Sequence, residues 1–182
     1  MSSQRGFTLM ELLFGFALLA ILAGMTIVSV QVSMAHARGD AAMSQVTSVL
    51  RYARDAAIAQ KRSIDVVFVE PNRIQLLRND VPNGQTVLTD VPLESGAVFA
   101  HDPATPDTPD GFGDETAIDF DEAETIRYLP DGTLTDATEI PVNGTVFLAR
   151  PNEPLSTRAV TVSGGSGRAQ GYRWNGKLWE MR

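Results

Sequence analysis

The chain has 182 residues, 43% of them hydrophobic and 20% charged, which are ordinary values for a globular domain. Its 15 Lys and Arg against 22 Asp and Glu give a formal net charge of −7, which argues against a general nucleic-acid coat but leaves room for a local basic patch. It has no Cys and two His, which excludes a disulfide framework, a cysteine nucleophile and a thiolate metal site.

The N-terminal region contains one long apolar run. No charged residue occurs from Leu12 to Ala35, and a bilayer core needs about 20 apolar residues in a helix. A signal peptide usually has a shorter apolar core followed by a small-x-small cleavage site, and a helix apolar on every side suits lipid better than a core of this size. We therefore predict a transmembrane helical segment over residues 7–35.

Glu11 interrupts the start of this run. A carboxylate at membrane depth costs on the order of 2.5–3.5 kcal/mol on insertion scales, so it tends to have a partner. The alternative is that Glu11 lies near the membrane surface, as a first-turn residue favoured by the helix dipole. Position alone leaves both interpretations open.

The segment Gln4-Arg5-Gly6-Phe7-Thr8-Leu9-Met10-Glu11-Leu12 resembles the class III signal of type IV pilins and pseudopilins. The resemblance implies cleavage of a leader, residues 1–6, between Gly6 and Phe7 by prepilin peptidase, followed by N-methylation of Phe7. It also implies that Glu11 neutralises the N-terminal ammonium of a neighbouring subunit. Opposite charges attract strongly in a low dielectric, and an unpaired buried charge is costly, so the physics agrees with this role.

The resemblance also implies a location and partners. Arg5 is the charge that precedes the cleavage site, and it favours a cytoplasmic N-terminus. The expected location is the inner membrane, with a single span and a periplasmic C-terminal domain, and also the pilus or pseudopilus. The expected partners are other pilins, prepilin peptidase and the inner-membrane assembly platform.

The helical pattern continues beyond the apolar run. Apolar residues recur at spacings of three and four, at Met43, Val46, Leu50, Ala53 and Ala57, so residues 36–62 should form an amphipathic continuation of one helix from about Thr8 to about Arg62. The period then becomes extended, and we expect a β-rich domain over residues 63–182. Strands are predicted at Ser63–Val69, Arg73–Arg78, Gln85–Thr89, Ala97–Ala100, Ala117–Phe120, Glu124–Tyr128, Thr145–Arg150 and Ala159–Ser163.

Two turns are predicted near the end of the chain. Pro130-Asp131-Gly132 is typical of a turn, and Asn175-Gly176 between two aromatic segments predicts a hairpin with a type I′ turn. The predicted fold class is therefore α+β, with a long N-terminal helix packed on a mainly antiparallel β-sheet. The segments Tyr128-Leu-Pro-Asp-Gly-Thr133 and Ala159–Arg168 resemble those of the H-type pseudopilins of type II secretion (GspH) and of the FimT/FimU minor pilins.

The middle of the chain is acidic. From Asp80 to Glu124 there are twelve acids and no base, and the part from His101 to Glu115 carries three Pro. Clustered carboxylates suit Ca²⁺, but the spacing does not match an EF-hand loop, and a solvated acidic loop is the simpler interpretation. Paired carboxylates of a glycosidase could be drawn from the same set, but almost any acidic loop offers such pairs. We expect no metal site, no cofactor and no enzymatic activity.

The last stretch is basic and aromatic. Arg168, Arg173, Lys177 and Arg182 alternate with Tyr172, Trp174 and Trp179, which is a composition that single-stranded nucleic-acid binding uses. Some FimT-type minor pilins bind DNA through a Gly-Arg-x-Arg element here, whereas this chain has Gly167-Arg168-Ala169-Gln170. The simpler interpretation is that the aromatic residues fill a sheet core and the bases form a solvated edge.

These observations predict a minor pilin or pseudopilin, a structural subunit of a type II secretion pseudopilus or of a type IV pilus that assembles through its N-terminal helix. Two alternatives stay open. One is a DNA-binding minor pilin for natural transformation, with contacts at the four bases named above. The other is a single-span anchored binding module that is never processed.

Overall fold

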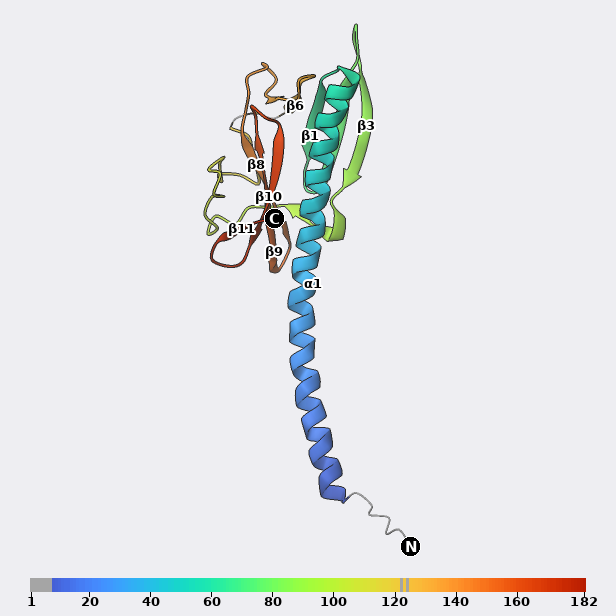
Figure 1. The fold of residues 1–182 in the computed structure, drawn as a ribbon, viewed down its shortest axis with the longest axis vertical. Coiled ribbons are helices and arrows are strands. Elements are labelled where there is room, and N and C mark those ends of the chain that lie inside the picture. Colours follow the sequence, from blue (N-terminus) through green and yellow to red (C-terminus); the bar gives the residue numbers. More distant parts are fainter. Residues whose placement is uncertain (1–7, 122, 124) are drawn as a thin grey trace. The chain divides into compact units, whose positions relative to one another are not determined.

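The computed structural model describes residues 8–121, 123 and 125–182, except for the side chains of residues 24–29. The predicted cleavage and methylation positions, Gly6 and Phe7, and the predicted strand start at Glu124 therefore lie outside the described residues. The chain divides into two compact units, Met1–Ala35 and His36–Arg182, and helix α1 (Leu9–Gln60) contributes to both (Figure 1).

In the first unit, α1 exposes most of its large apolar side chains. Those of Leu9, Phe14 and Leu19 are 79%, 72% and 62% exposed, and Leu12, Leu13, Phe16, Leu18, Ile21 and Leu22 are also exposed. An apolar surface this continuous on a soluble monomer is normally covered by a partner or by lipid. Among the described residues, no helix is long and apolar enough to qualify as a membrane span.

The second unit contains two antiparallel sheets. The first sheet has the order β3-β2-β1-β6-β7 and the second has the order β11-β10-β9-β8-β4, with β5 paired to β8. The strands of the first sheet are β1 (Ile64–Val69), β2 (Arg73–Asn79), β3 (Gln85–Pro92), β6 (Ile126–Tyr128) and β7 (Leu134–Thr135). Those of the second are β4 (Val98–Phe99), β5 (Ile118–Asp119), β8 (Gly144–Arg150), β9 (Glu153–Ser163), β10 (Arg168–Trp174) and β11 (Trp179–Met181), and a short 3-10 helix, η1, covers Glu94–Gly96.

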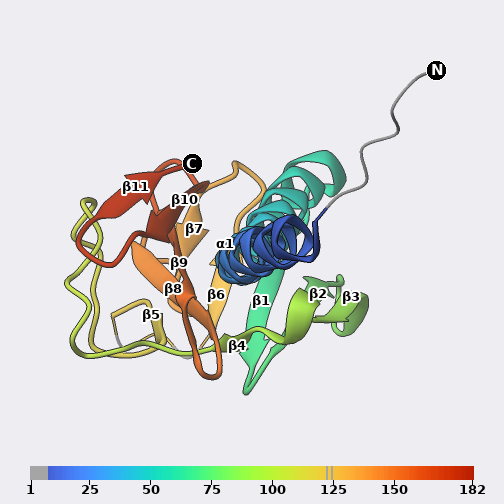
Figure 2. The ribbon, with the colours of Figure 1, turned by 90° about the horizontal axis from the view of Figure 1, so that it is seen from below.

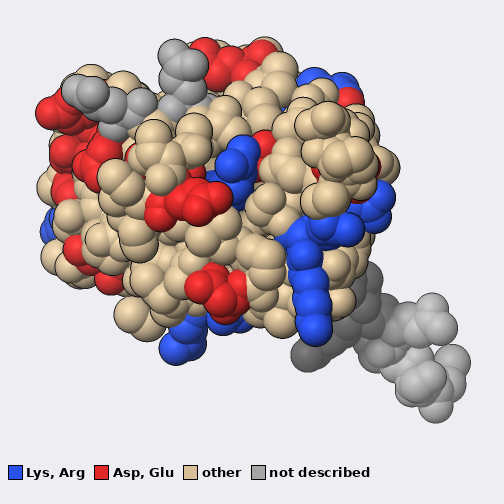
Figure 3. Space-filling model, turned by 90° about the horizontal axis from the view of Figure 1, so that it is seen from above, with Lys and Arg blue, Asp and Glu red and all other residues tan. Residues whose placement is uncertain are grey.

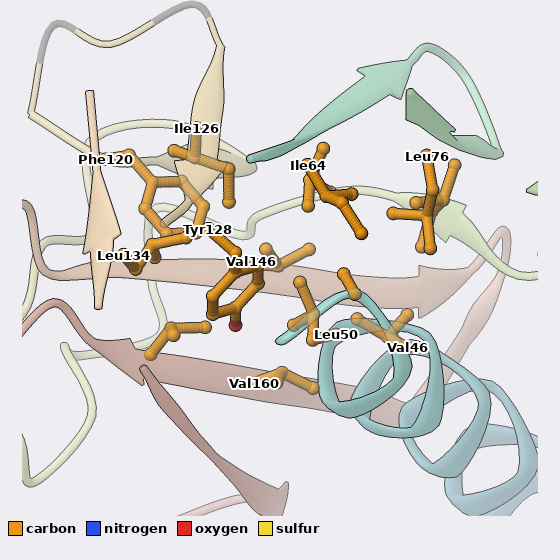
Figure 4. Packing of buried hydrophobic residues seen from close by; sticks show 14 of the residues in the cluster. Val46, Leu50, Ile64, Leu76, Phe120, Ile126, Tyr128, Leu134, Val146 and Val160 are labelled. Atoms are coloured by element: carbon orange, nitrogen blue, oxygen red, sulfur yellow. The ribbon is translucent and has the colours of Figure 1, made fainter. Parts of the chain in front are cut away.

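The core lies where α1 meets the inner faces of both sheets. Figure 2 shows the 36–60 part of α1 over β1, with β8, β9 and β10 beside it. The apolar stripe predicted on the helix is buried: Val46, Leu50, Ala53 and Ala57 have 0% exposure, and Met43 has 6%. Figure 4 shows Val46 and Leu50 pointing toward Ile64 and Leu76 of the first sheet and toward Val146 and Val160 of the second. The sheets therefore share one core with α1, and the α+β fold class is confirmed.

The predicted turns have mixed outcomes. Pro130–Gly132 forms the expected turn, because Gly132 donates to the carbonyl of Leu129 and has a φ of +88°. The C-terminal hairpin forms with Trp174 opposite Trp179, but its turn is not type I′, because Gly176 has a positive φ and Asn175 does not. Asn175 instead accepts hydrogen bonds on Oδ1 from the amides of Lys177 and Leu178, so its side chain organises a longer turn.

Candidate functional site

The start of α1 is organised by Thr8 and Glu11. The hydroxyl of Thr8 accepts a hydrogen bond from the amide of Glu11 (3.2 Å), and Glu11 Oε2 accepts from the amide (2.9 Å) and the hydroxyl (3.0 Å) of Thr8. This reciprocal pattern is a capping box, which satisfies two of the amide donors that a helix start leaves unpaired. Glu11 is exposed, and no described donor lies within hydrogen-bonding distance of its Oε1.

The cap gives Glu11 a role inside its own chain. This cap matches the interpretation of Glu11 as a first-turn residue. It does not test the assembly role, because Oε1 of Glu11 can still accept a hydrogen bond from the terminal ammonium of another subunit. The sequence contained this signal in the spacing Thr-x-x-Glu before an apolar run.

A second polar site joins α1 to β9 through Arg158. The side chain of Arg158 has no exposed surface, and its Nε donates to Asp40 Oδ1 over 2.7 Å. Its two terminal nitrogens donate to the main-chain carbonyls of His36 (2.8 Å), Leu155 (3.0 Å) and Thr157 (2.7 Å). Burial lowers the pKa of Arg158, and the hydrogen bond to Asp40 opposes that shift. This buried cation therefore fixes the 36–40 turn of α1 on the second sheet.

Gly39 makes this contact possible. A Cβ at this position would lie 2.4 Å from the carbonyl oxygen of Ser156 and 2.9 Å from the guanidinium carbon of Arg158. This Arg158–Asp40 pair could not be predicted from the sequence, since the two residues are 118 positions apart. A glycine inside an otherwise helical pattern was the available signal, because such glycines often mark close packing.

The four C-terminal bases do not form one site. Arg168 is exposed at the start of β10. The residue before it, Gly167, packs on Arg54, because a Cβ added at Gly167 would lie 3.1 Å from the side chain of Arg54. Arg173 lies at the other end of β10. Its Nη1 is 3.9 Å from Asp40 Oδ2, and its Nε is 4.0 Å from Glu180 Oε2. Asp40 and Arg54 are separated by about 21 Å along the helix at 1.5 Å per residue. Arg168 is thus far from Arg173.

The remaining two bases lie in the C-terminal hairpin region. Arg182 pairs with Glu180 over 3.7 Å, and Lys177 is exposed in the hairpin turn. The structure therefore brings Arg173 and Arg182 together around Glu180, in contact with acids, and leaves Arg168 elsewhere. This is not the continuous basic track that the DNA-binding alternative requires.

The aromatic residues of this region are packed rather than presented. Phe147, Ala159, Tyr172 and Trp179 form a second buried cluster on the outer face of the second sheet, with Trp174 against it. The indole of Trp179 donates to the carbonyl of Pro106 over 2.8 Å, and the ring of His101 lies 4.4 Å from that of Phe147. The simpler interpretation of the aromatic residues as core is therefore confirmed.

The proline-rich part of the acidic middle, residues 101–116, is the cover of this cluster. Asp110 accepts a hydrogen bond from the hydroxyl of Thr161 over 2.6 Å. Asp107 accepts bonds from the amides of Thr108 and Gly113, which hold the loop in a compact shape. Burial, with the neighbouring Asp110 carboxylate, raises the pKa of Tyr172 to about 12. Part of the acidic middle is thus structural, although it has almost no regular secondary structure.

Beyond this loop, the acidic middle lines a hollow of about 710 Å³. Four carboxylates border it, those of Glu115, Asp119, Asp121 and Asp136, together with apolar side chains such as Phe120 and Ile140. Asp119 is buried and accepts a hydrogen bond from the amide of Glu115. Within the described residues, no three acidic or histidine side chains are close enough to hold a metal ion.

Comparison with known proteins identifies this architecture. The family model described as "Type II transport protein GspH" matches residues 42–167, from the core-facing part of α1 to the turn before β10. The chain belongs to this family. The model of the prokaryotic N-terminal methylation motif matches residues 1–27, which include Gly6, Phe7 and Glu11.

One solved structure supports the fold of this GspH-family chain. A crystal structure of the type IV minor pilin FimU of Pseudomonas aeruginosa (strain PAO1) matches with a TM-score of 0.50 and 14% sequence identity, covering 78% of this chain and 91% of that one. A second crystal form of FimU matches with a TM-score of 0.48 and 15% identity, covering 72% and 90%. No sequence among the curated proteins matches the chain. The GspH-family chain is therefore a pilin-like subunit of the type IV pilus and type II secretion class.

Proposed function

We propose that this GspH-family chain is a minor pilin or pseudopilin that is anchored in the inner membrane by residues 7–35 and assembles into a filament through the N-terminal part of α1. It performs no chemistry of its own and holds no cofactor. The observation that carries the proposal is the exposed apolar surface of α1 directly after Glu11, within the segment that matches the N-terminal methylation motif. Such a surface is stable against lipid in the membrane and against neighbouring helices in a filament.

The proposal includes processing by prepilin peptidase between Gly6 and Phe7 and methylation of Phe7. Removal of the leader would place the new terminal ammonium one residue before Thr8, close to the capping box. The mass of the intact protein extracted from membranes tests this step. Recovery of the complete leader from cells with active prepilin peptidase would instead support the unprocessed anchored module.

Glu11 is proposed to accept the terminal ammonium of a neighbouring subunit, which would use the carboxylate oxygen left free by the cap. An amide at this position can still complete a capping box, because Glu and Gln both serve at the third helical position. Glu11→Gln therefore keeps the local cap and removes the charge, whereas Thr8→Ala removes the hydroxyl of the cap and keeps the charge.

These two variants separate the two roles of Glu11. If Glu11 is the assembly contact, Glu11→Gln should lose most incorporation into sheared filaments while the amount in the membrane is unchanged, because the neighbour's buried ammonium lacks a counter-charge. Thr8→Ala should cost about 0.5–2 kcal/mol of helix stability and retain incorporation. Normal incorporation of Glu11→Gln together with defective Thr8→Ala would show that Glu11 is only a cap.

A further inference from the structure

The charged residues that follow the proposed anchor are linked in one cluster. Arg38 and Asp40 lie in α1 directly after residue 35, and both form ion pairs with the second sheet, Arg38 with Glu153 and Asp40 with Arg158. Three acids link the cluster, and each has two Arg within 4.0 Å: Glu153 has Arg38 and Arg150, Asp40 has Arg158 and Arg173, and Glu180 has Arg173 and Arg182. We call these residues the anchor-proximal cluster.

The anchor-proximal cluster carries an excess of positive charge. Its five Arg share three carboxylates, so the ion pairs neutralise only part of that charge. Lys177, in the exposed turn between β10 and β11, adds a base that has no described carboxylate within 4.0 Å. Six bases against three acids give a local balance of +3, whereas the whole chain carries −7. Figure 3 looks onto the end of the domain where α1 terminates, and it shows Asp and Glu side chains gathered toward the left and top.

The turn between β10 and β11 extends toward the anchor. Strand β10 begins beside Gly167, which packs on Arg54, and ends near Arg173, which lies close to Asp40, so it runs along α1 toward the N-terminal end of the helix. The turn that follows continues beyond Asp40 and presents Lys177–Leu178, with Leu178 62% exposed. An exposed apolar side chain next to a base suits a membrane interface, where the apolar group lies among the headgroups and the ammonium meets phosphate.

The length of the proposed anchor places the cluster at the membrane surface. Residues 7–35 would be about 44 Å long at 1.5 Å per residue, and a bilayer with its headgroups is roughly 40–45 Å thick. Helix α1 continues without a break to Gln60, so Arg38 and Asp40 emerge within the next turn, about 5–8 Å farther along. That distance is within the screening length of roughly 8 Å at physiological salt.

We propose that the anchor-proximal cluster and the adjoining Lys177–Leu178 turn dock on anionic phospholipid headgroups of the membrane that holds the chain. Guanidinium groups bind phosphate with two parallel hydrogen bonds, so lipid phosphates supply the counter-charge that the shared carboxylates leave incomplete. Each Lys or Arg near an anionic surface raises the bound population by roughly fivefold. A charged surface needs a net positive excess at short range, not the continuous track of free bases that a nucleic-acid strand requires.

The inference rests on the proposed function and adds a lipid contact to it. The contact holds the domain against the membrane while the subunit is stored there, and entry into a filament must break it.

The absence of Cys allows single-site labelling of the full-length chain. A fluorophore is attached at Pro151→Cys, in the exposed turn between β8 and β9 beside Glu153, and in a reference sample at Asn83→Cys, in the exposed turn between β2 and β3. The reference turn lies near the C-terminal end of α1, because Arg78 of β2 donates to Gln60. Each chain is reconstituted into nanodiscs of phosphatidylcholine, with or without phosphatidylglycerol, that contain the same share of a lipid with a quenching spin label on its headgroup.

The lipid contact predicts quenching that depends on lipid charge. At Pro151→Cys we expect quenching to be roughly twofold stronger with phosphatidylglycerol, and high salt should return it to the phosphatidylcholine level. At Asn83→Cys the two lipid mixtures should give the same signal, because this turn is about 33 Å from Arg38 along α1.

Two triple variants of the Pro151→Cys chain test which charges are responsible. Neutralising the anchor-proximal end, with Arg38→Gln, Lys177→Gln and Arg182→Gln, should abolish the gain in quenching. The matched control, with Arg51→Gln, Lys61→Gln and Arg62→Gln, removes the same charge from exposed positions farther from the anchor and should retain the gain. Circular dichroism verifies that both variants are folded, and the lipid and salt comparisons in the unaltered background decide the question if either is not.

The outcomes separate this inference from the proposed function. Equal quenching in the two lipid mixtures would overturn the lipid contact, and so would a gain that survives neutralisation of the anchor-proximal end. An equal loss in both triple variants would assign the effect to the overall charge of the chain and overturn it as well. In each case, retention in the bilayer and incorporation into sheared filaments would leave the proposed function intact. A chain that neither stays in the bilayer nor enters filaments would contradict the proposed function itself.

Discussion

The guanidinium of Arg158 is fully buried and lies 2.7 Å from the carboxylate of Asp40, which is 39% exposed. The pair connects a turn of α1 to the centre of β9 and is flanked by Arg173 on the same carboxylate. Removing one partner of a buried pair leaves the other charge uncompensated, which is usually more costly than the pair is stabilising.

The first prediction compares the two partners of this pair. Arg158→Ala should cost about 3–5 kcal/mol in the free energy of unfolding, because it leaves a cavity, removes the Arg158 donors from three main-chain carbonyls and leaves Asp40 without its counter-charge. Asp40→Ala should cost less, about 1–3 kcal/mol, since Arg158 keeps those carbonyls as acceptors. Urea denaturation followed by circular dichroism measures both, and Arg38→Ala, from the half-exposed pair with Glu153, should cost at most about 1 kcal/mol. If all three substitutions lowered the free energy of unfolding equally, Arg158 would not be the main contact that holds α1 on β9.

The second prediction concerns Gly39. In an exposed helix, Gly→Ala would stabilise by about 0.8–1 kcal/mol. Here the added Cβ would meet the carbonyl oxygen of Ser156 at 2.4 Å, and this main-chain atom cannot move aside cheaply. Overpacking of this kind costs about 1–3 kcal/mol, so Gly39→Ala should destabilise the domain in thermal unfolding.

Gly165 provides a matched control for this substitution. It has open space at its Cβ position and no positive φ, so Gly165→Ala should leave the melting temperature nearly unchanged. A stabilised Gly39→Ala variant would mean that α1 and β9 are farther apart than described.

The third prediction is a pH dependence centred on His36. Burial, with the positive charges of Arg173 and Arg158, lowers the pKa of His36 below its ordinary value of 6.5, although Asp40 opposes the shift. In the unfolded chain His36 should titrate near its ordinary value, and in the folded chain it titrates lower. Between these two pKa values, His36 is protonated in the unfolded chain and neutral in the folded chain. Stability should therefore fall as the pH decreases through this window and show no further change from His36 below it.

Chemical denaturation at a series of pH values between 7 and about 5 tests this, since most carboxylates titrate lower. His36→Gln should flatten the slope, and His101→Gln serves as the comparison. An unchanged slope in His36→Gln would assign the effect to other groups.

The fourth prediction concerns the cover formed by residues 101–116. Trp179→Phe keeps an aromatic ring but removes the indole donor to Pro106, so it should cost about 0.5–1.5 kcal/mol and loosen the loop. Limited proteolysis should then cut within this loop faster than in the wild type. Trp174→Phe is the control, because no described acceptor lies within hydrogen-bonding distance of its indole nitrogen, and comparable cleavage in both variants would contradict the role of this bond.

Much of the fold could be predicted because it is encoded locally. The stripe from Met43 to Ala57 and the extended period after Ser63 both report which side of an element is buried. The strand β7 was missed, because Leu134–Thr135 is too short to show an alternating pattern. The turn at Asn175 was assigned to the wrong type, since a side-chain hydrogen bond decided its geometry.

The candidate sites were less accessible to sequence reasoning. Thr8 and Glu11 are three residues apart, and their cap could be read from that spacing. The Arg158–Asp40 pair and the joining of Arg54 with Gly132 and Gly167 depend on how distant strands approach α1. The four C-terminal bases looked continuous in sequence, but β10 places Arg168 and Arg173 at opposite ends of one strand.

The loop over the second sheet is held by a few side-chain and ring contacts, at His101, Pro106 and Asp110, rather than by strand pairing. A segment attached at separate points can gain or lose residues between them without disturbing the register of the sheet beneath. Exposed positions between the anchors, such as Pro103 and Ala104, are therefore natural places for epitope tags or fluorophores. The same arrangement lets relatives with this sheet differ widely in the outer surface they present.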